Sequence, residues 1–204
     1  MAVNDKLTKT PYKTEKYTEQ QLLELAKCAN DPKYFMREFC YIQHPTKGRM
    51  KFDLYDFQND LVDCYHNNRY SIAMLARQMG KSTCAAGYLL WYAMFNPDQT
   101  ILIAAHKYSG ASEIMQRIRF AYETLPDFIR AGVTAYNKGS LEFDNGSRIV
   151  AQSTTENTGR GLSISLAYLD EFAFVRPNIA KEFWTSLSPT LATGGKCIIT
   201  STPN

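Results

Sequence analysis

The chain has 204 residues, of which 45% are hydrophobic and 21% are charged, and its formal net charge is +3. This length and apolar content are sufficient for one buried core, so a single domain is the default. The net charge is too small to indicate nucleic-acid binding by itself, and the 23 basic residues form no polybasic block. No signal peptide is recognisable, and no apolar stretch approaches the ~18 residues of a membrane span.

Cysteine and histidine usage argues against a disulfide framework or a zinc site. The five cysteines are an odd number without a CxxC pair, and the three histidines are scattered. We therefore expect reduced thiols in a cytosolic protein.

The first third of the chain predicts a leader followed by helices. Residues 1–17 are polar and rich in Lys and Thr, which is typical of a flexible leader. A capping-box pattern at Thr18 opens a helix through about residue 29, and Asp31-Pro32 opens a second helix to about residue 39. A loop at 44–48 precedes a third helix that ends near residue 65. We treat 18–70 as one N-terminal helical segment.

From residue 71 the pattern alternates between strands and helices, and we treat 71–204 as the core. Continuously apolar runs such as Ile101–Ala105 indicate strands of a parallel sheet covered on both faces. Turn residues at 137–139 and 144–146 suggest a β-hairpin or small meander beside the sheet. The predicted strands are 71–76, 100–105, 147–152, 165–170 and 196–201, and the predicted helices are 81–95, 109–125 and 178–187.

Gly80-Lys81-Ser82 joins an apolar strand to an Ala-rich helix. A helix N-terminus directs backbone N–H groups and a favourable dipole at phosphate, while a lysine reaches the β and γ phosphates and the hydroxyl binds Mg²⁺. The usual phosphate-binding loop has a glycine where this chain has Leu75. An ordinary turn between a core strand and a surface helix is therefore the alternative.

Asp170 and Glu171 follow the apolar run Leu166–Leu169. Because side chains alternate along a strand, the two carboxylates should point in different directions, one toward Mg²⁺ and the other toward the attacking water. The alternative is a helix N-cap acid followed by a first-turn glutamate.

Four segments resemble, in this order, the ATPase region of large terminase subunits, the DNA-packaging motors of tailed bacteriophages. The resemblance implies an α/β P-loop NTPase of the ASCE/RecA-like type, with a mainly parallel sheet flanked by helices. A small β-hairpin insertion and an N-terminal helical segment complete the expected fold. The four segments are the adenine-recognition segment (Tyr41–Pro45 with Leu54–Gln58), a deviant Walker A (Arg77–Ser82), Walker B with the catalytic glutamate (Leu166–Glu171) and the coupling motif (Thr200–Asn204).

The resemblance also implies a role for individual residues. Glu171 would activate water, and Arg77 would act as an arginine finger in cis; a surface cation that helps to bind phosphate is the alternative for Arg77. Arg160 is a candidate for an arginine supplied to a neighbouring subunit, with a loop cation as the alternative. The implied ATP contacts are Tyr55, Phe57, Gln58, Arg77, Gln78, Met79, Gly80, Lys81, Ser82 and Thr83; the Mg²⁺ ligands are Ser82 and Asp170; the coupling residues are Thr200, Ser201 and Thr202.

The implied function is hydrolysis of ATP to drive double-stranded DNA into a procapsid. The implied partners are the portal protein, the small terminase subunit and further copies of the chain in a pentameric ring. We expect the protein in the host cytoplasm, docked at the portal during packaging and not retained in the virion.

The sequence ends directly after the coupling motif, so we expect a fragment without the nuclease domain of its relatives. In the usual strand order of this class, the coupling-motif strand lies between the Walker A and Walker B strands, and a later strand flanks the Walker A strand. Two alternatives stay open: a helicase-type nucleic-acid ATPase, and a fragment that binds nucleotide without efficient turnover.

Overall fold

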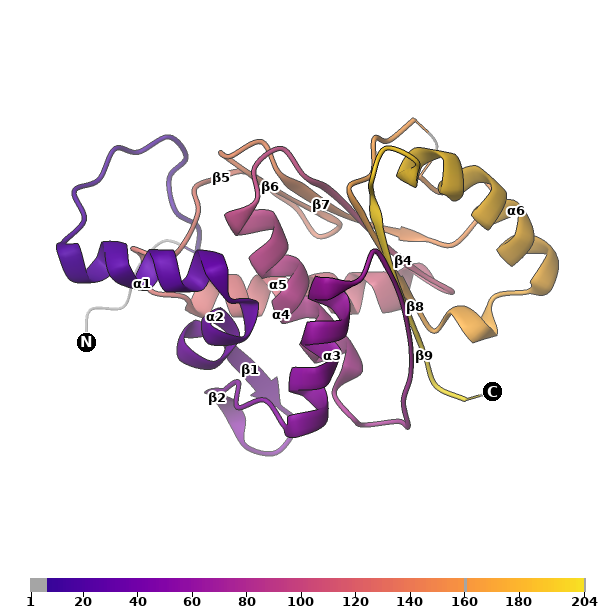
Figure 1. Ribbon diagram of the computed structural model, residues 1–204, viewed down its shortest axis with the longest axis horizontal. Coiled ribbons are helices and arrows are strands. Elements are labelled where there is room, and N and C mark those ends of the chain that lie inside the picture. Colours follow the sequence, from indigo (N-terminus) through magenta and orange to yellow (C-terminus); the bar gives the residue numbers. More distant parts are fainter. Residues whose placement is uncertain (1–6, 160, 204) are drawn as a thin grey trace.

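The computed structural model describes residues 7–159 and 161–203, and Figure 1 shows their arrangement. The helices are α1 (Glu19–Asn30), α2 (Pro32–Phe39), α3 (Asp56–Asn67), α4 (Lys81–Phe95), α5 (Tyr108–Thr124) and α6 (Pro177–Leu187), with short 3₁₀ turns η1 (Phe172–Phe174) and η2 (Ser188–Leu191). The strands are β1 (Tyr41–His44), β2 (Gly48–Lys51), β3 (Tyr70–Met74), β4 (Thr100–Ala105), β5 (Val133–Tyr136), β6 (Ser140–Phe143), β7 (Arg148–Ser153), β8 (Leu166–Asp170) and β9 (Lys196–Ser201).

Seven of these strands form one sheet in the order β3-β9-β8-β4-β7-β6-β5. The first five are parallel, whereas β6 and β5 continue the sheet as an antiparallel meander. The predicted α/β fold class is confirmed, and so is the position of β9 between β3 and β8. Because the carboxyl ends of parallel strands meet at one edge, the residues that follow β3, β8 and β9 are brought together.

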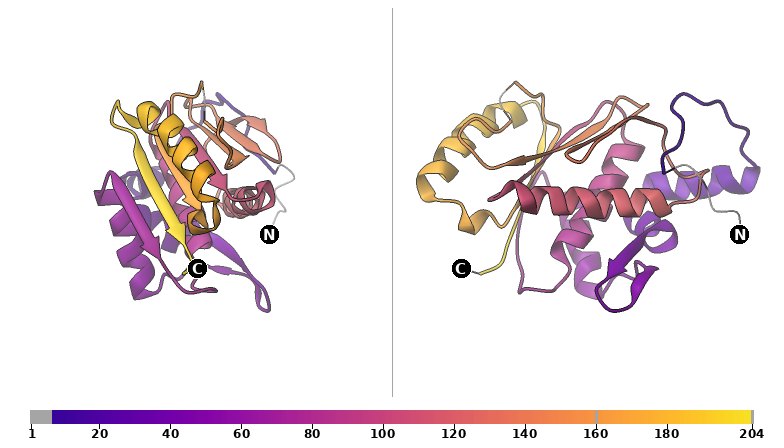
Figure 2. Two further views of the ribbon diagram at one scale, coloured as in Figure 1. Left: turned by 90° about the vertical axis from the view of Figure 1, so that its right-hand side faces the viewer. Right: turned by 180° about the vertical axis from the view of Figure 1, so that it is seen from behind.

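Alternation along the central strands divides the interior into two layers. Ile101 and Ile103 of β4 pack with α2 to α5, while Leu102 and Ala104 pack with α6 and η2. Figure 2 (left) shows the same division, with β9 between α6 on one side and the purple helical layer on the other. Every residue of β8 is buried, which explains its uninterrupted apolar run.

At the outer edge, β3 has a different character. Its side chains alternate between buried and exposed, and Ile72 and Met74 are 76% and 70% exposed. The predicted Walker A strand is therefore an edge strand within the described part of the chain, paired with β9 alone.

The N-terminal helices begin where the sequence predicts. Thr18 forms a reciprocal capping box with Gln21, and the Asp31 side chain accepts from the Lys33 N–H at 2.8 Å ahead of Pro32. The structure adds an antiparallel hairpin, β1–β2, on both sides of the predicted loop at 44–48. Sequence reasoning missed it because its strands have four residues each and none of these residues is buried.

The flexibility predicted for the leader at 1–17 stays a prediction, but its described residues 7–17 make specific contacts with the core. Lys9 forms a β-bridge with Gly132, is 8% exposed and donates to the Asp127 carbonyl at 3.0 Å. Its ammonium also pairs with Glu15 at 2.8 Å, so the charge is satisfied while the aliphatic stem is covered. Residues 1–6 of the predicted leader lie outside the described residues.

All five cysteines are free, as predicted. Burial raises the pKa of the Cys28 thiol to about 12, so this thiol stays protonated and unreactive. Among the described residues no helix is long and apolar enough to cross a membrane, and no group of three or more His, Cys, Asp or Glu could hold a metal ion by itself.

Candidate functional site

The loop between β3 and α4 has the backbone that a phosphate-binding turn requires. Gln78 and Gly80 have φ values of +64° and +72°, and α4 begins at Lys81 directly afterwards. Backbone in this region turns successive N–H groups toward a common concavity. The positive φ favours glycine at position 80, and a Cβ there would lie 2.7 Å from Gln58 Nε2 and would displace this amide.

The acidic pair at the end of β8 diverges as strand alternation predicts. Asp170 is 8% exposed, and its Oδ1 accepts from the Thr200 hydroxyl at 3.0 Å and the Tyr168 hydroxyl at 3.2 Å. Glu171 leaves the strand with φ +50°, a left-handed backbone that costs a non-glycine residue about 1–2 kcal/mol. Such strain concentrates at functional positions.

Lys81 and Glu171 meet although 90 residues separate them in the chain. The Lys81 ammonium forms an ion pair with Glu171 Oε1. Glu171 Oε2 accepts from the Thr202 N–H at 2.9 Å, the Thr202 hydroxyl at 3.0 Å and the Ser201 hydroxyl at 3.3 Å. The phosphate-binding loop, the acidic pair and the last described strand thus form one cluster, at the lower edge of Figure 1. The N-cap alternative made Asp170 the capping acid and Glu171 a first-turn residue. Instead Asp170 is the last residue of β8, and Glu171 precedes η1 without a side-chain capping bond.

The electrostatic environments of the two acids differ. Burial raises the pKa of Asp170 above its ordinary value, and the nearby Lys81 and the Thr200 hydroxyl offset this only in part. Partial burial also acts to raise the pKa of Glu171, but the hydrogen bonds from Lys81 and Thr202 outweigh it and leave that pKa lowered. While Glu171 remains paired with Lys81, its carboxylate is therefore fixed in position and is a weak base.

Gln58 connects the start of α3 to the phosphate-binding loop. It is 4% exposed, its Nε2 donates to the Met79 carbonyl at 3.2 Å, and its Oε1 accepts from the Tyr55 N–H at 3.2 Å. Its predicted contact with adenine stays a prediction, because both amide atoms bond the backbone here. Tyr55 is 68% exposed, and its ring stacks on Phe57 with centroids 5.8 Å apart.

A cavity of about 250 Å³ lies between β1, α4 and α5, and Thr83 in the first turn of α4 borders it. The predicted segment Tyr41–Pro45 lines one side of the cavity. On the other side Arg117 donates to the Thr83 hydroxyl at 3.0 Å and pairs with Glu113 at 2.5 Å. Sequence reasoning missed Arg117; its only signal was an Arg four residues after a Glu on a predicted helix.

The two candidate arginines are less constrained. Arg77 is exposed and makes no hydrogen bond or ion pair with any residue in the described ranges. Arg160 lies outside the described residues. Ser82 is half-buried at the second position of α4, directly after the lysine.

In this sheet, the first core strand leads through the turn into a helix, and an acidic pair ends another parallel strand of the same sheet. These features define the P-loop NTPase class of α/β proteins. Residues 72–204 match the family model for the N-terminal part of the T4likevirus-type terminase large subunit. The chain belongs to this family, as its motifs predicted.

Solved structures share the fold. The ATPase domain of the large terminase of Thermus phage P74-26 is 23% identical, with a TM-score of 0.62 over 75% of this chain and 66% of that one. The large terminase of bacteriophage HK97 is 22% identical, with a TM-score of 0.67 over 85% of this chain and 37% of that one. A large terminase from a thermophilic bacteriophage, solved in complex with ADP, is 11% identical, with a TM-score of 0.56 over 73% and 39% of the two chains. The chain therefore spans between about a third and two thirds of these proteins.

Proposed function

We propose that this chain binds ATP with Mg²⁺ and hydrolyses it, as the motor part of a phage DNA-packaging machine. The observation that carries the proposal is the convergence of Lys81, Glu171 and Thr202 at the carboxyl edge of the parallel sheet. Family membership and the ADP complex of the large terminase from the thermophilic bacteriophage support it.

The phosphates would lie at the N-terminus of α4. Their negative charge is favoured there by the helix dipole and by the N–H groups of the loop. Phosphate oxygens would compete with Glu171 for the Lys81 ammonium, whose side chain is 11% exposed and already aimed into the cluster. Nucleotide binding would then release Glu171 from its ion pair.

The donor set fits Mg²⁺. This ion usually takes one or two protein oxygens and completes its shell with phosphate and water. Asp170 and Ser82 supply a carboxylate and a hydroxyl at adjacent ends of β8 and α4, and the protein hydrogen bonds to Asp170 in the described chain all end on Oδ1. Oδ2 is thus left for the ion, which when bound would neutralise phosphate charge.

Glu171 would serve as the base. A water oxygen attacks the γ-phosphorus, the bond between that phosphorus and the bridging oxygen to the β-phosphate breaks, and the water proton passes to the carboxylate. Loss of the Lys81 pair would raise the proton affinity of Glu171 at the moment the nucleotide arrives. Arg77, which has no partner among the described residues, is the arginine that we propose to act in cis and to stabilise the negative charge on the γ-phosphate.

For the adenine base we propose the predicted contacts Tyr55, Phe57 and Gln58. Gln58 touches the phosphate-binding loop through Met79, and the stacked pair offers an exposed aromatic face next to it. The cavity beside Thr83 borders the first turns of α4, the helix that follows this loop.

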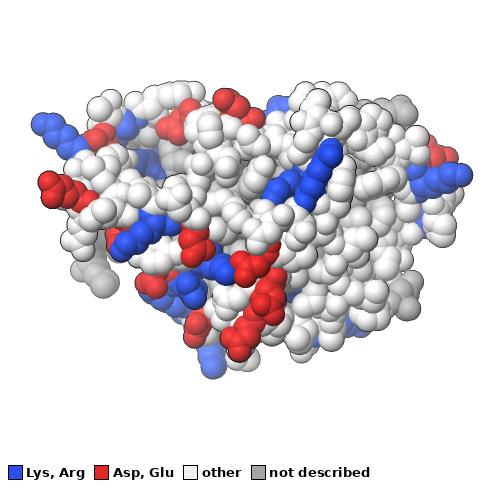
Figure 3. All heavy atoms as spheres, viewed as in Figure 1, with Lys and Arg blue, Asp and Glu red and all other residues white. Residues whose placement is uncertain are grey.

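Work on DNA belongs to the whole protein and is likewise a proposal. Double-stranded DNA, the portal protein, the small terminase subunit and a ring of copies are the partners, with Arg160 as the candidate for the arginine that acts across the ring. The host cytoplasm at the procapsid is the proposed location. On the face in Figure 3, basic and acidic side chains are interspersed and the right-hand part is largely uncharged, so this view offers no extended basic surface for DNA.

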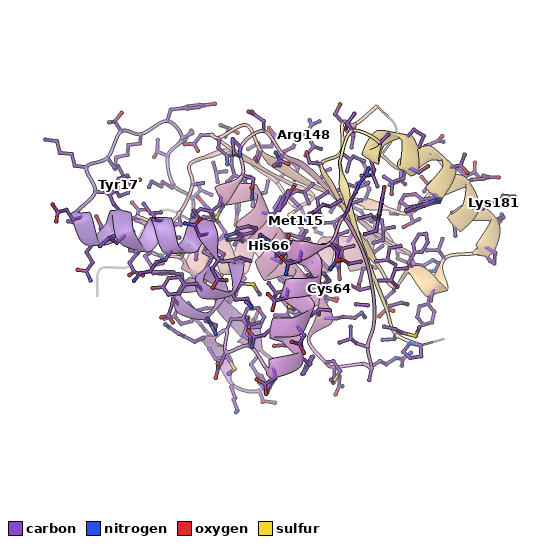
Figure 4. All side chains as sticks on the ribbon, in the orientation of Figure 1. Tyr17, Cys64, His66, Met115, Arg148 and Lys181 are labelled. Carbon is purple, nitrogen blue, oxygen red and sulfur yellow. The ribbon has the colours of Figure 1, made fainter. Side chains whose placement is uncertain are left out.

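The test compares nucleotide binding and phosphate release in the wild type, Lys81→Ala and Glu171→Ala. Lys81→Ala should lose binding, whereas Glu171→Ala should bind but hydrolyse about 10²–10⁴-fold more slowly. Lys181→Ala is the control, because Lys181 is an exposed lysine of α6 at the margin of the molecule in Figure 4. Hydrolysis by Glu171→Ala at the wild-type rate would refute the assigned base, and unwinding of a forked duplex would favour the helicase alternative.

A further inference from the structure

Tyr168 places a hydroxyl group within the run of apolar residues that leads to Asp170 in β8. It is completely buried in β8, two residues before Asp170, so both side chains lie on the same face of the sheet. A phenol hydroxyl removed from water must find a hydrogen-bond partner or cost free energy.

The partners of Tyr168 are the groups of the proposed metal site. Its oxygen lies 2.8 Å from Thr200 Oγ1 and 3.2 Å from Asp170 Oδ1, while Thr200 Oγ1 donates to Asp170 Oδ1 at 3.0 Å. Two hydroxyl protons therefore serve three contacts. Thr200 donates to the carboxylate, and Tyr168 donates either to the same carboxylate oxygen or to the Thr200 oxygen.

We propose that Tyr168 is a positioning residue for the divalent cation that accompanies the nucleotide. It fixes the rotation of the Asp170 carboxylate by holding Oδ1, either directly or through the Thr200 hydroxyl, so that Oδ2 is presented to the ion. Removing a hydrogen-bond partner that holds a metal-binding carboxylate in this way typically lowers the metal affinity by about 10–100-fold. The inference rests on the proposed function of this site.

The same contacts connect Asp170 to the residues that hold Glu171. Thr200 belongs to β9, and the next two residues, Ser201 and Thr202, donate to Glu171. Tyr168 bridges β8 to this strand, so a shift of β9 would disturb both carboxylates together.

The experiment replaces Tyr168 by phenylalanine and measures Mn²⁺ binding to the ADP complex by electron paramagnetic resonance. Tyr168→Phe should weaken Mn²⁺ affinity about tenfold or more, while ADP affinity in EDTA stays within about twofold of wild type. Thr200→Val should produce a similar loss. Tyr88→Phe is the matched control, since Tyr88 is equally buried but its hydroxyl donates to the Tyr65 carbonyl at 3.3 Å.

Unchanged Mn²⁺ affinity in Tyr168→Phe would overturn the proposal, and so would an equal loss in Tyr88→Phe. A second measurement needs no nucleotide: urea unfolding of Tyr168→Phe, Asp170→Asn and the double variant in EDTA. The two changes should be coupled, and strictly additive effects would overturn the proposed contact. A wild type that binds ADP neither with metal nor in EDTA would instead refute the proposed function, whatever the double-mutant cycle shows.

Discussion

At the scale of single residues, the buried carboxylate of Asp170 shows that a group placed for binding can lower the stability of the fold. Its carboxylate is buried beside Lys81, yet burial outweighs the attraction and raises its pKa. Ionisation of Asp170 is therefore less favourable in the folded protein than in the unfolded chain, where water solvates the carboxylate. A nucleotide-bound cation is the partner that would offset this cost.

We predict that Asp170→Asn stabilises the metal-free protein at neutral pH. Because the folded-state pKa lies above the ordinary value, the folded protein binds more protons between the two, and wild-type stability falls as the pH rises through that window. The pH-dependent gain in the free energy of unfolding of Asp170→Asn over the wild type should be complete above the folded-state pKa of Asp170. It should vanish below about pH 3.9, the ordinary pKa of an aspartate. Urea unfolding in EDTA across this range measures it, and a lower midpoint for Asp170→Asn at pH 7 would contradict it.

Residue types and spacing were enough to predict that Lys81, Asp170 and Glu171 would meet. They were not enough to find Tyr168 or Arg117. Tyr65 and Tyr88 are also buried tyrosines, and nothing in sequence distinguishes a hydroxyl that reaches a carboxylate from one that reaches a backbone carbonyl. Such contacts depend on which strands are neighbours, and therefore on the completed fold.

At the scale of elements, the junction between α3 and the phosphate-binding loop depends on one side chain. Gln58 bonds the backbone at both ends, and Gly80 leaves just enough room for its amide. We infer that α3 sets the conformation of the loop before α4 as well as covering the core.

Replacing Gln58 by alanine should destabilise the protein by about 1–3 kcal/mol, because the Met79 carbonyl and the Tyr55 N–H lose a buried partner. Nucleotide affinity should fall as well, since the loop is no longer fixed. Asn68→Ala is the control at the other end of α3. Asn68 is exposed, and among the described residues its side chain bonds the Cys64 carbonyl of the same helix alone, so the change should stay within about 0.5 kcal/mol. Thermal unfolding measures the stability and ADP titration measures the nucleotide affinity. Equal effects of Gln58→Ala and Asn68→Ala would refute the inference that Gln58 connects α3 to the loop.

Most core elements were predictable because their signals are strong. The Ala-rich helix at 81–95 and the strands at 100–105 and 196–201 match their predicted bounds, and the remaining core elements lie within two residues. The contacts of the leader could not be predicted for a physical reason: its polar composition says nothing of the bridge that Lys9 makes to Gly132, a long-range pairing without a local pattern.

At the scale of the whole molecule, the sheet order determines the site. Placing β9 between β3 and β8 brings Thr200 beside Asp170 and Thr202 beside Glu171, although about 30 residues separate these partners. Of these three strands, β8 is covered by apolar layers on both faces, as is β4 beside it, whereas β3 is covered on one face. At the carboxyl ends of these strands, the Lys81 and Glu171 side chains are partly exposed and can meet a ligand. Tyr168 and Thr200, which support the cluster, are fully buried.

This arrangement predicts where hydrogen exchange should slow when Mg²⁺ and a non-hydrolysable ATP analogue are added. Amides of β4 and β8 should exchange slowly in all conditions, because they lie in the buried centre of the sheet. Added protection should appear together in three separate segments: 76–83, 170–174 and 200–202. A ligand that merely sits in the cavity beside Thr83 would protect 41–45 and the α5 face instead, and leave 170–174 unchanged. Mass-spectrometric exchange on the wild type, with Lys81→Ala as the variant that should show no added protection, separates these outcomes. Simultaneous protection of the three segments would mean that one ligand contacts all three strand ends, as the order β3-β9-β8 requires.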